Sequence, residues 1–595
     1  MNVPRRIARA LDGKFKLTAW ITSRSYAKDD ERKVVVLDET TVAEAGASAR
    51  TSEARERRGY TPRYRRDIEI RRVMHKISDW ERANEVNART EAREGSGKSK
   101  AAVWPTQAAM KNALSIEVNR EITTNENGEG ILEHIRSRGH EYNMVNCATA
   151  WHRLAKMFRM GRLPRTWRAV QDKRVEELEA ISHRLLETFA VQNLSNMVWS
   201  CAVLGYRPRG DLLGKAADEM EKKVEGFYPQ ALTNTLWAYA TLKHPRAVKL
   251  AQTLAPAMLA TLPKNEVSLT RAENATEGQF STQAVSNALW TYASLGVNPG
   301  VELLDGLASW VSKNADTFKS QELSNAAWSY AQLGHHPGDS TLSALERCLL
   351  ERKDEYTTQA LANSSIGLAY FGGSKDGGLK TMFNAVTPST FRLSDGNSQD
   401  LSNLTWAIAA VGAFESLLYK AAVRQLFRRD AKEFAPEGLK MIFHAMLMQK
   451  DFDPDRSKVD VVYPDWVNED ARKAWLTQTT ETRVSTFQQQ VALTIKGLGV
   501  ETVMEHTTED EVYSMDICIL DKKVAIECDG PSHYYTNLTS VPTQKTVLRN
   551  RALAARGWKV VVVPYYIWHD EWSSSGARAY IGKLLRDHGA LEWNE

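Results

Sequence analysis

Three carboxylates near the C-terminus are of the residue type and spacing used by metal-dependent nucleases. Asp516 lies in an apolar stretch that predicts a β-strand, and Glu527 and Asp529 lie in the next predicted strand. Because side chains alternate between the faces of a strand, Glu527 and Asp529 share one face. Carboxylate oxygens gathered at one sheet edge could hold Mg²⁺, which would activate a water molecule for attack on a phosphodiester.

The same acids also have a structural interpretation. The familiar nuclease arrangement has a lysine two residues after the second acid, and this sequence has Asp529 there. Lys545 could supply the missing charge from the following helix, or the acids could form hydrogen-bonded pairs with Arg549 and Arg551. No metal ligand is therefore assigned, and Mg²⁺ is expected as a cofactor only if the domain cleaves RNA.

The elements that would position these acids form a compact α/β unit over residues 483–595, preceded by a charged linker over 451–482. A short turn at Asp521–Lys523 predicts that the two central strands form an antiparallel hairpin. The predicted helices cover 487–498, 545–556 and 576–588, and the predicted strands cover 502–505, 512–520, 524–529 and 558–566.

An internal repeat fills the middle of the chain. The segment Gln192-Asn-Leu-Ser-Asn-Met-Val-Trp199 recurs with its Gln at residues 230, 283, 321, 359 and 399, and a degenerate copy starts at Glu437. The Gln-to-Gln steps are 38, 53, 38, 38, 40 and 38 residues, the long step containing an insertion near 264–278. A weaker, earlier copy centres on Trp151. Such regularity predicts a repeat architecture.

Each repeat predicts two helices. With the Gln numbered zero, apolar residues at +2, +6, +7, +9, +10 and +12 form a wide helical stripe. Gly205, Gly296, Gly334 and Gly412 stand at +13, where a helix ends, and a second amphipathic helix follows. A single hairpin cannot bury both apolar faces, so neighbouring hairpins should stack into an α-solenoid over about 139–450.

Positions +1, +5 and +8 form a stripe of small or polar residues that changes between repeats. We expect this stripe to be exposed, with small residues admitting a flat base and polar groups reading base edges. The Asn at +4 is the same in six copies, which favours a structural role or contact with the RNA backbone. The Trp at +7 is interpreted mainly as core, with base stacking as the alternative. The candidate RNA-binding residues in the repeats are Asn193, Asn196, Ser200, Asn234, Thr235, Asn287, Thr291, Asn325, Ser329, Asn363, Ser364 and Asn403.

These motifs resemble two known families. The 38-residue spacing with Q-x-L-S-N-x-x-W-x-x-A resembles the octotricopeptide repeat, which implies sequence-specific RNA binding in an organelle. Ile526-Glu-Cys-Asp-Gly-Pro-Ser-His533, with Gly557-Trp-Lys-Val560 and Pro564-Tyr-Tyr-Ile-Trp568, resembles the RAP domain. The RAP resemblance implies a restriction-endonuclease-like fold used in organellar RNA metabolism, shared with the Fas-activated serine/threonine kinase-like mitochondrial proteins. His533, Lys545, Arg549 and Arg551 are its candidate RNA contacts.

The distribution of charge bears on nucleic-acid binding and on the cellular compartment. The chain has 78 Lys and Arg against 73 Asp and Glu, and without residues 1–26 the two counts are equal, so nucleic-acid binding must rest on local patches. Residues 1–26 hold six basic residues and one acid, which predicts an organellar transit peptide. Residues 27–130 predict a charged arm, largely disordered or helical. The absence of an apolar run of about 18 residues excludes a spanning helix.

The sequence therefore predicts an α-solenoid of helical-hairpin repeats followed by a small α/β endonuclease-like domain. We expect a mitochondrial matrix protein, or alternatively a plastid one, that binds single-stranded mRNA or rRNA in transcript processing, stability or translation. One alternative is a Mg²⁺-dependent endoribonuclease using Asp516, Glu527 and Asp529. The other is a structural rRNA-binding subunit of an organellar ribosome such as the mitoribosome.

Overall fold

The computed structural model describes residues 107–263, 280–387, 393–453, 461–479, 484–570 and 574–591. The predicted transit peptide, most of the predicted arm and the insertion near 264–278 lie outside these residues. None of the described helices is long and apolar enough to cross a membrane.

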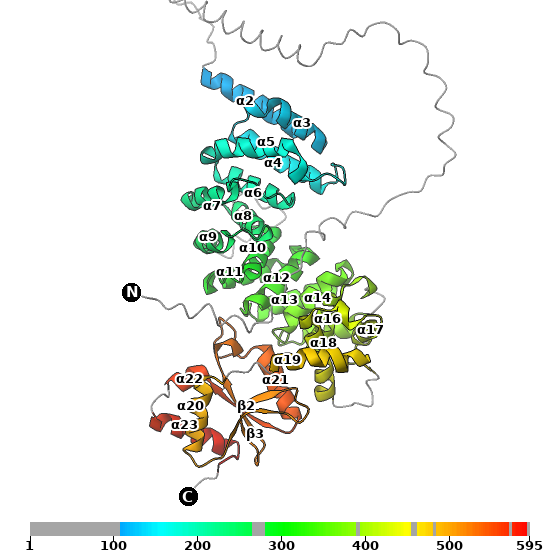
Figure 1. Cartoon of the computed structure of the whole chain (residues 1–595), viewed down its shortest axis with the longest axis vertical. Helices are drawn as coiled ribbons and strands as arrows, with labels where there is room; N and C mark the ends of the chain where they lie inside the picture. The colour runs from blue at the N-terminus through cyan, green and yellow to red at the C-terminus, as the bar shows by residue number, and fades with distance from the viewer. Residues whose placement is uncertain are drawn as a thin grey trace, which may run out of the picture. The chain divides into compact units, whose positions relative to one another are not determined.

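Two rows of helices run through the repeat region, as predicted (Figure 1). The first helix of each repeat packs on the first helix of the next, and the second helices form a parallel row in the same way. The first helices are α4 (Met144–Arg159), α6 (Val191–Val203), α8 (Pro229–Thr241), α10 (Thr282–Leu295), α12 (Ser320–Leu333), α14 (Thr358–Ala369), α16 (Ser398–Ala410) and α18 (Pro436–Phe452). The second helices are α5 (Lys173–Leu185), α7 (Leu212–Lys222), α9 (Ala247–Thr261), α11 (Val301–Asn314), α13 (Asp339–Glu351), α15 (Gly378–Ala385) and α17 (Leu417–Leu426).

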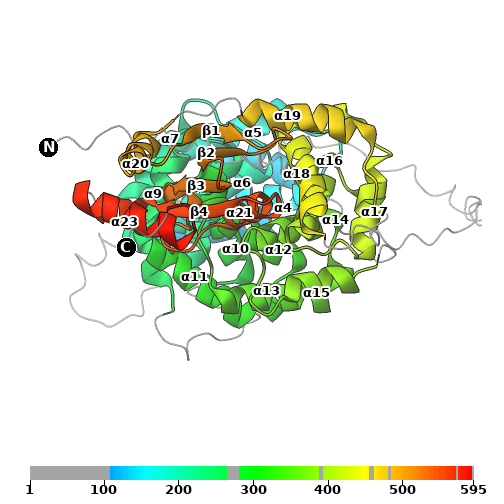
Figure 2. The ribbon, with the colours of Figure 1, turned by 90° about the horizontal axis from the view of Figure 1, so that it is seen from below.

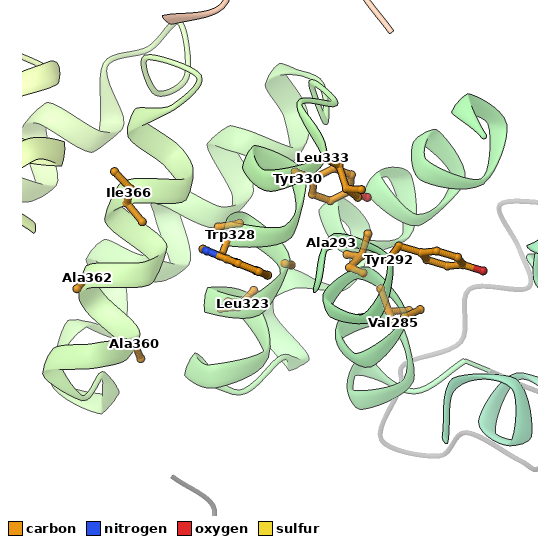
Figure 3. Packing of buried hydrophobic residues seen from close by; sticks show 14 of the residues in the cluster. Val285, Tyr292, Ala293, Leu323, Trp328, Tyr330, Leu333, Ala360, Ala362 and Ile366 are labelled. Carbon is orange, nitrogen blue, oxygen red and sulfur yellow. The ribbon is translucent and has the colours of Figure 1, made fainter. Parts of the chain in front are cut away.

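The repeat sequence explains how the two rows are joined. Gly334 ends α12 with a φ of 63°, a left-handed conformation that favours glycine, and Pro337 then prevents the helix from continuing. In α8, α10 and α12, a buried Tyr at +9 links the first helix to the second helix of the preceding repeat. The hydroxyl of Tyr330 donates to the Leu304 carbonyl over 3.0 Å, and Tyr239 donates to Leu213 over 2.7 Å. Figure 3 shows Tyr292 and Tyr330 in this packing.

Helices also flank the repeats. α2 (Gln107–Thr124) and α3 (Gly128–Arg138) precede α4, and α3 packs against both α4 and α5. The stretch predicted as a linker, 451–482, contains a π-helical turn at Val467–Ala471 and α19 (Arg472–Thr479), and both pack against α18.

The C-terminal unit is a four-stranded sheet with helices on both faces, in the order β1-β2-β3-β4 (Figure 2). β2 (Ser514–Ile519) and β3 (Val524–Asp529) form the predicted antiparallel hairpin. β1 (Val503–Thr507) is antiparallel to β2, and β4 (Lys559–Pro564) is parallel to β3. Ile517 and Ile526 share a core with α20 (Thr486–Lys496) and α23 (Ser574–Asp587). Cys518 and Ala525 face the opposite way, into the core that includes Leu548 of α21 (Gln544–Ala555).

Candidate nucleic-acid interface

The variable stripe at +1, +5 and +8 is buried, so our expectation that it is exposed is wrong. Ser200, Thr235, Thr291 and Ser329 are fully inaccessible, and Ser364 is 3% exposed. Gly367 shows why the stripe is made of small residues. A Cβ atom added there would lie 2.5 Å from the backbone carbon of Ala327 in the neighbouring first helix. Small side chains therefore serve the close approach of adjacent helices and do not admit a base.

The polar groups of the buried stripe have structural partners. The side chain of Asn193 accepts a hydrogen bond from the backbone N–H of Ala190 over 3.1 Å. Glu322 and Asp400 make the same contact, at the same position, in their repeats. These +1 residues satisfy backbone donors that a helix N-terminus leaves without a partner. At +8, Ser200 donates to the Asn196 carbonyl over 2.6 Å.

A different stripe of the first helices faces solvent. We call it the recurrent stripe: positions 0, +4, +7 and +11, which lie one helical turn apart. In α6 it consists of Gln192, Asn196, Trp199 and Val203. The Gln is exposed and the other three side chains are half-buried, while the residues between them are buried. None of the residues at these four positions in the six clear copies is charged.

The Trp at +7 is less accessible to solvent in the later repeats, whereas the exposure of the Asn at +4 follows no such trend. The Asn is half-buried in α6, α8 and α14, 9% exposed at Asn325 and 1% exposed at Asn403. Trp199, Trp237 and Trp290 are half-buried, whereas Trp328 and Trp406 are 6% and 8% exposed. Of the remaining candidates, Asn234 and Asn363 are half-buried and Asn287 is 8% exposed.

The weaker first copy of the repeat lies around Trp151 in α4, but Trp151 itself does not take the place of the repeated Trp. Trp151 is fully buried, and its indole N–H donates to Ser182 over 2.9 Å. The half-buried His152 takes the place that Trp holds in the other repeats, and its ring centroid lies 5.3 Å from that of Trp199. The guanidinium of Arg159 lies 5.9 Å from the Trp199 ring centroid. A cation and two aromatic rings therefore meet at this end of the recurrent stripe.

The three candidate catalytic acids lie on one face of the sheet, but each has a partner. A carboxylate oxygen of Asp516 accepts from the backbone N–H of Cys528 over 2.7 Å. Glu527 is completely buried and pairs with Arg549 of α21. Asp529 is 1% exposed, and its carboxylate lies 2.8 Å from Nδ1 of His533.

The cations predicted near these acids take separate positions. Burial lowers the pKa of Arg549 from its ordinary value, and the charge of Asp516 opposes this shift. Arg551 lies away from the cluster, with its guanidinium 4.2 Å from the ring centroid of Phe452 in α18. Lys545 is exposed and lies near Lys440 of α18. Within the described ranges, no group of three His, Cys, Asp or Glu side chains is arranged to hold a metal ion.

Sequence reasoning missed two sets of residues. The Gln at position 0 is as regular as the Asn at +4, and their spacing of one helical turn could have indicated a shared face.

The second set is Tyr535, Thr536 and Asn537, which join the C-terminal domain to the solenoid. The Thr536 N–H donates to the Gly334 carbonyl over 2.8 Å. The Asn537 amide accepts from the His336 N–H over 2.8 Å and donates to the His336 carbonyl over 2.9 Å. No local pattern marks such a contact.

Comparisons with known proteins support the resemblance of the C-terminal unit to the RAP domain. Residues 526–584 match the RAP domain. This segment begins in β3 and ends in α23, and it includes Glu527, Asp529 and Arg549. The chain is also similar to "RAP domain-containing protein, chloroplastic" from Oryza sativa subsp. japonica, at 21% identity over 451 residues. The match covers 74% of this chain and 60% of the relative, so the chain spans under two thirds of that protein.

Proposed function

We propose that this chain is an organellar RNA-binding protein that acts in transcript processing, stability or translation. Single-stranded RNA lies against the exposed part of the recurrent stripe, and the RAP domain holds the end of the solenoid. The observation that carries the proposal is a stripe of Gln, Asn and Trp, repeated in successive first helices and open to solvent in α6 and α8, in a chain that ends in a RAP domain.

The chemistry of the stripe suits a nucleic-acid strand. Gln and Asn amides each offer donors and acceptors to base edges, ribose hydroxyls and phosphates. Trp rings provide stacking surfaces for bases of any identity, and the rings of Trp199 and Trp237 are partly exposed. The octotricopeptide-like spacing supports the same interpretation, because helical-repeat RNA readers use about one base per repeat.

Binding without cleavage is the better-supported role for the RAP domain. Glu527, the central acid of the supposed catalytic set, is sealed from solvent and neutralised by Arg549. A hydrolytic metal site needs an open coordination position for water or substrate. We therefore base the proposal on recognition, and neither the nuclease nor the ribosomal alternative has a specific observation in its favour.

The plastid is the proposed compartment. The relative in rice is named as chloroplastic, which favours the plastid alternative over our first expectation of a mitochondrion. Residues 1–26 have the Arg-rich, acid-poor composition of an organellar transit peptide. A fusion of the N-terminal 106 residues to a fluorescent protein should accumulate in plastids of plant cells. Accumulation in mitochondria would contradict this assignment.

A pair of adjacent residues tests the RNA-binding surface. Asn234 lies on the recurrent stripe, and Thr235 is buried on the variable stripe. In filter binding with organellar transcripts at a fixed salt concentration, Asn234→Ala should weaken binding by about 1–3 kcal/mol if its amide contacts a base or ribose. The nearly isosteric Thr235→Val should bind like the unmodified protein. Equal, weak binding of all three proteins to unrelated transcripts would refute specific recognition.

A further inference from the structure

The recurrent stripe is divided into an open part and a covered part. In α6, α8 and α10 the Gln is exposed and the Trp ring is half-buried. In α16 both Asn403 and Trp406 are buried, and neither amide atom of Asn403 has a hydrogen-bond partner among the described residues. The same motif is therefore partly exposed in some repeats and buried in others. Burial of the Asn403 amide without a hydrogen-bond partner among the described residues is energetically unfavourable.

Residues of the RAP domain and of α19 contact the stripe at α14 and at α18. The hydroxyl of Tyr535 donates to the carbonyl of Tyr370, the +11 residue of α14, over 3.2 Å. Its ring also packs at 5.1 Å from His336 and 5.5 Å from Phe371. Tyr535 is 3% exposed, and Tyr370 is half-buried.

A second contact is made at His444 in the last repeat. His444 holds the +7 position of α18, and its ring lies 5.0 Å from Trp475 of α19. Trp475 in turn donates its indole N–H to the carbonyl of Val512 in the C-terminal unit, over 2.7 Å. Together with the Tyr535 contact, this places the RAP domain and α19 against the +7 to +11 end of the stripe at α14 and at α18.

The open part has features that suit a strand of RNA. His152, Trp199, Trp237 and Trp290 supply one half-buried aromatic ring per repeat. Exposed cations lie in or directly after these first helices: Lys156 and Arg159 in α4, Arg207 after α6 and Lys243 after α8. Neutral amides and rings for the bases are thus combined with nearby cations for the phosphates.

We propose that single-stranded RNA occupies the recurrent stripe only from α4 to α10, and that the Tyr535–Asn537 segment of the RAP domain sets the far end of this site. The inference rests on the proposed RNA binding and adds which repeats the RNA occupies. Bases stack against the four rings, about one per repeat. The strand stops before α12, because the turn after that helix is hydrogen-bonded to Thr536 and Asn537.

Gln→Glu substitutions at position 0 test the extent of the site. Gln192, Gln230, Gln283 and Gln399 are all exposed and stand in the first turn of their helices, where a negative charge favours the helix. A loss of RNA binding would therefore not reflect unfolding. The probe is a fluorescein-labelled, fully randomised 16-nucleotide RNA pool, measured by anisotropy with the full chain at fixed salt.

We expect Gln192→Glu, Gln230→Glu and Gln283→Glu each to weaken binding about fivefold, because a new negative charge beside the bound strand repels its phosphates. The matched control, Gln399→Glu, should bind like the unmodified protein. An equal loss for Gln399→Glu would overturn the limited site while leaving RNA binding intact. Absence of binding by the unmodified chain, with the pool and with organellar transcripts, would instead overturn the proposed function.

The role of the RAP segment is tested by removing its contacts. In a Tyr535→Ala/Asn537→Ala background, Gln399→Glu should now weaken binding, because the covered repeats become accessible. If Gln399→Glu remains without effect in that background, this segment does not set the end of the site. Circular dichroism of the helical signal would verify that the double variant keeps its repeats.

Discussion

The polar residues of the solenoid and those of the RAP sheet have opposite environments. In α6 and α8, the Gln side chains are exposed and the Asn side chains are half-buried. In β3, Glu527 and Asp529 are buried, and each lies against a cation or an imidazole. Exposed, repeated amides leave donors and acceptors for a ligand, whereas neutralised acids serve the stability of the fold.

The largest expected effect would come from breaking the buried pair in the sheet. Glu527→Ala leaves the Arg549 guanidinium buried without its partner, so the free energy of unfolding should fall by about 3–5 kcal/mol in urea. Removing both charges, in Glu527→Ala/Arg549→Met, should recover much of this loss. A well-folded Glu527→Ala protein that has lost a Mg²⁺-dependent cleavage activity would reverse our assignment.

A pH-dependent effect is expected at the junction of the two regions. Burial, with the charges of Lys545 and Arg556, lowers the pKa of His444 to about 3 from an ordinary value of 6.5. The unfolded chain therefore binds more protons than the folded chain between these values, and stability falls as the pH drops from 6.5 toward 3. The contribution is at most about 1.4 kcal/mol per pH unit. Thermal unfolding across this range should show a shallower slope for His444→Gln.

A second histidine contributes to that slope. Burial lowers the pKa of His152 to about 4, so it adds a slope of the same sign above that pH. An unchanged slope for His444→Gln would show that the buried histidine is not responsible.

A moderate effect is expected where a predicted base-reading residue proves to be a helix cap. Asn193→Ala removes the acceptor for the Ala190 N–H and should cost roughly 1 kcal/mol in the free energy of unfolding. Asn193→Asp keeps the acceptor and should be close to neutral. RNA affinity should be the same for both, and a change in base preference with Asn193→Ala would restore the variable stripe as a reading surface.

The smallest effect is expected inside the variable stripe. The Thr235 hydroxyl is buried, and no hydrogen-bond partner for it is present among the described residues. Thr235→Val removes that polar group at nearly constant shape, so the unfolding free energy should change by less than about 0.5 kcal/mol or rise slightly. A loss above 1 kcal/mol in urea would mean that the hydroxyl has a structural partner.

The sequence predicted the fold well because periodicity and turn chemistry are local. The Gln-to-Gln spacing placed the first helices, the Gly at +13 marked where several of them end, and β3 has the predicted bounds 524–529. The short turn at Asp521–Lys523 was enough to pair β2 with β3.

The site was harder to predict because the same residues can serve two purposes. Small side chains admit a ligand or a neighbouring helix, and only the packing of Gly367 on Ala327 shows which applies. Lys545 and Arg549 lie one turn apart on α21, and sequence could not decide which of them reaches Glu527. The contact of Asn537 with His336 joins residues 201 positions apart and leaves no local signal.

Photo-crosslinking followed by mass spectrometry tests the central claim most directly. The full chain would be irradiated with 4-thiouridine-containing RNA, and the modified peptides would be identified. Adducts on peptides that contain Trp199, Trp237 and Trp290 are expected, since these rings line the open stripe. Adducts confined to residues 526–584, with none in α4 to α10, would contradict the account.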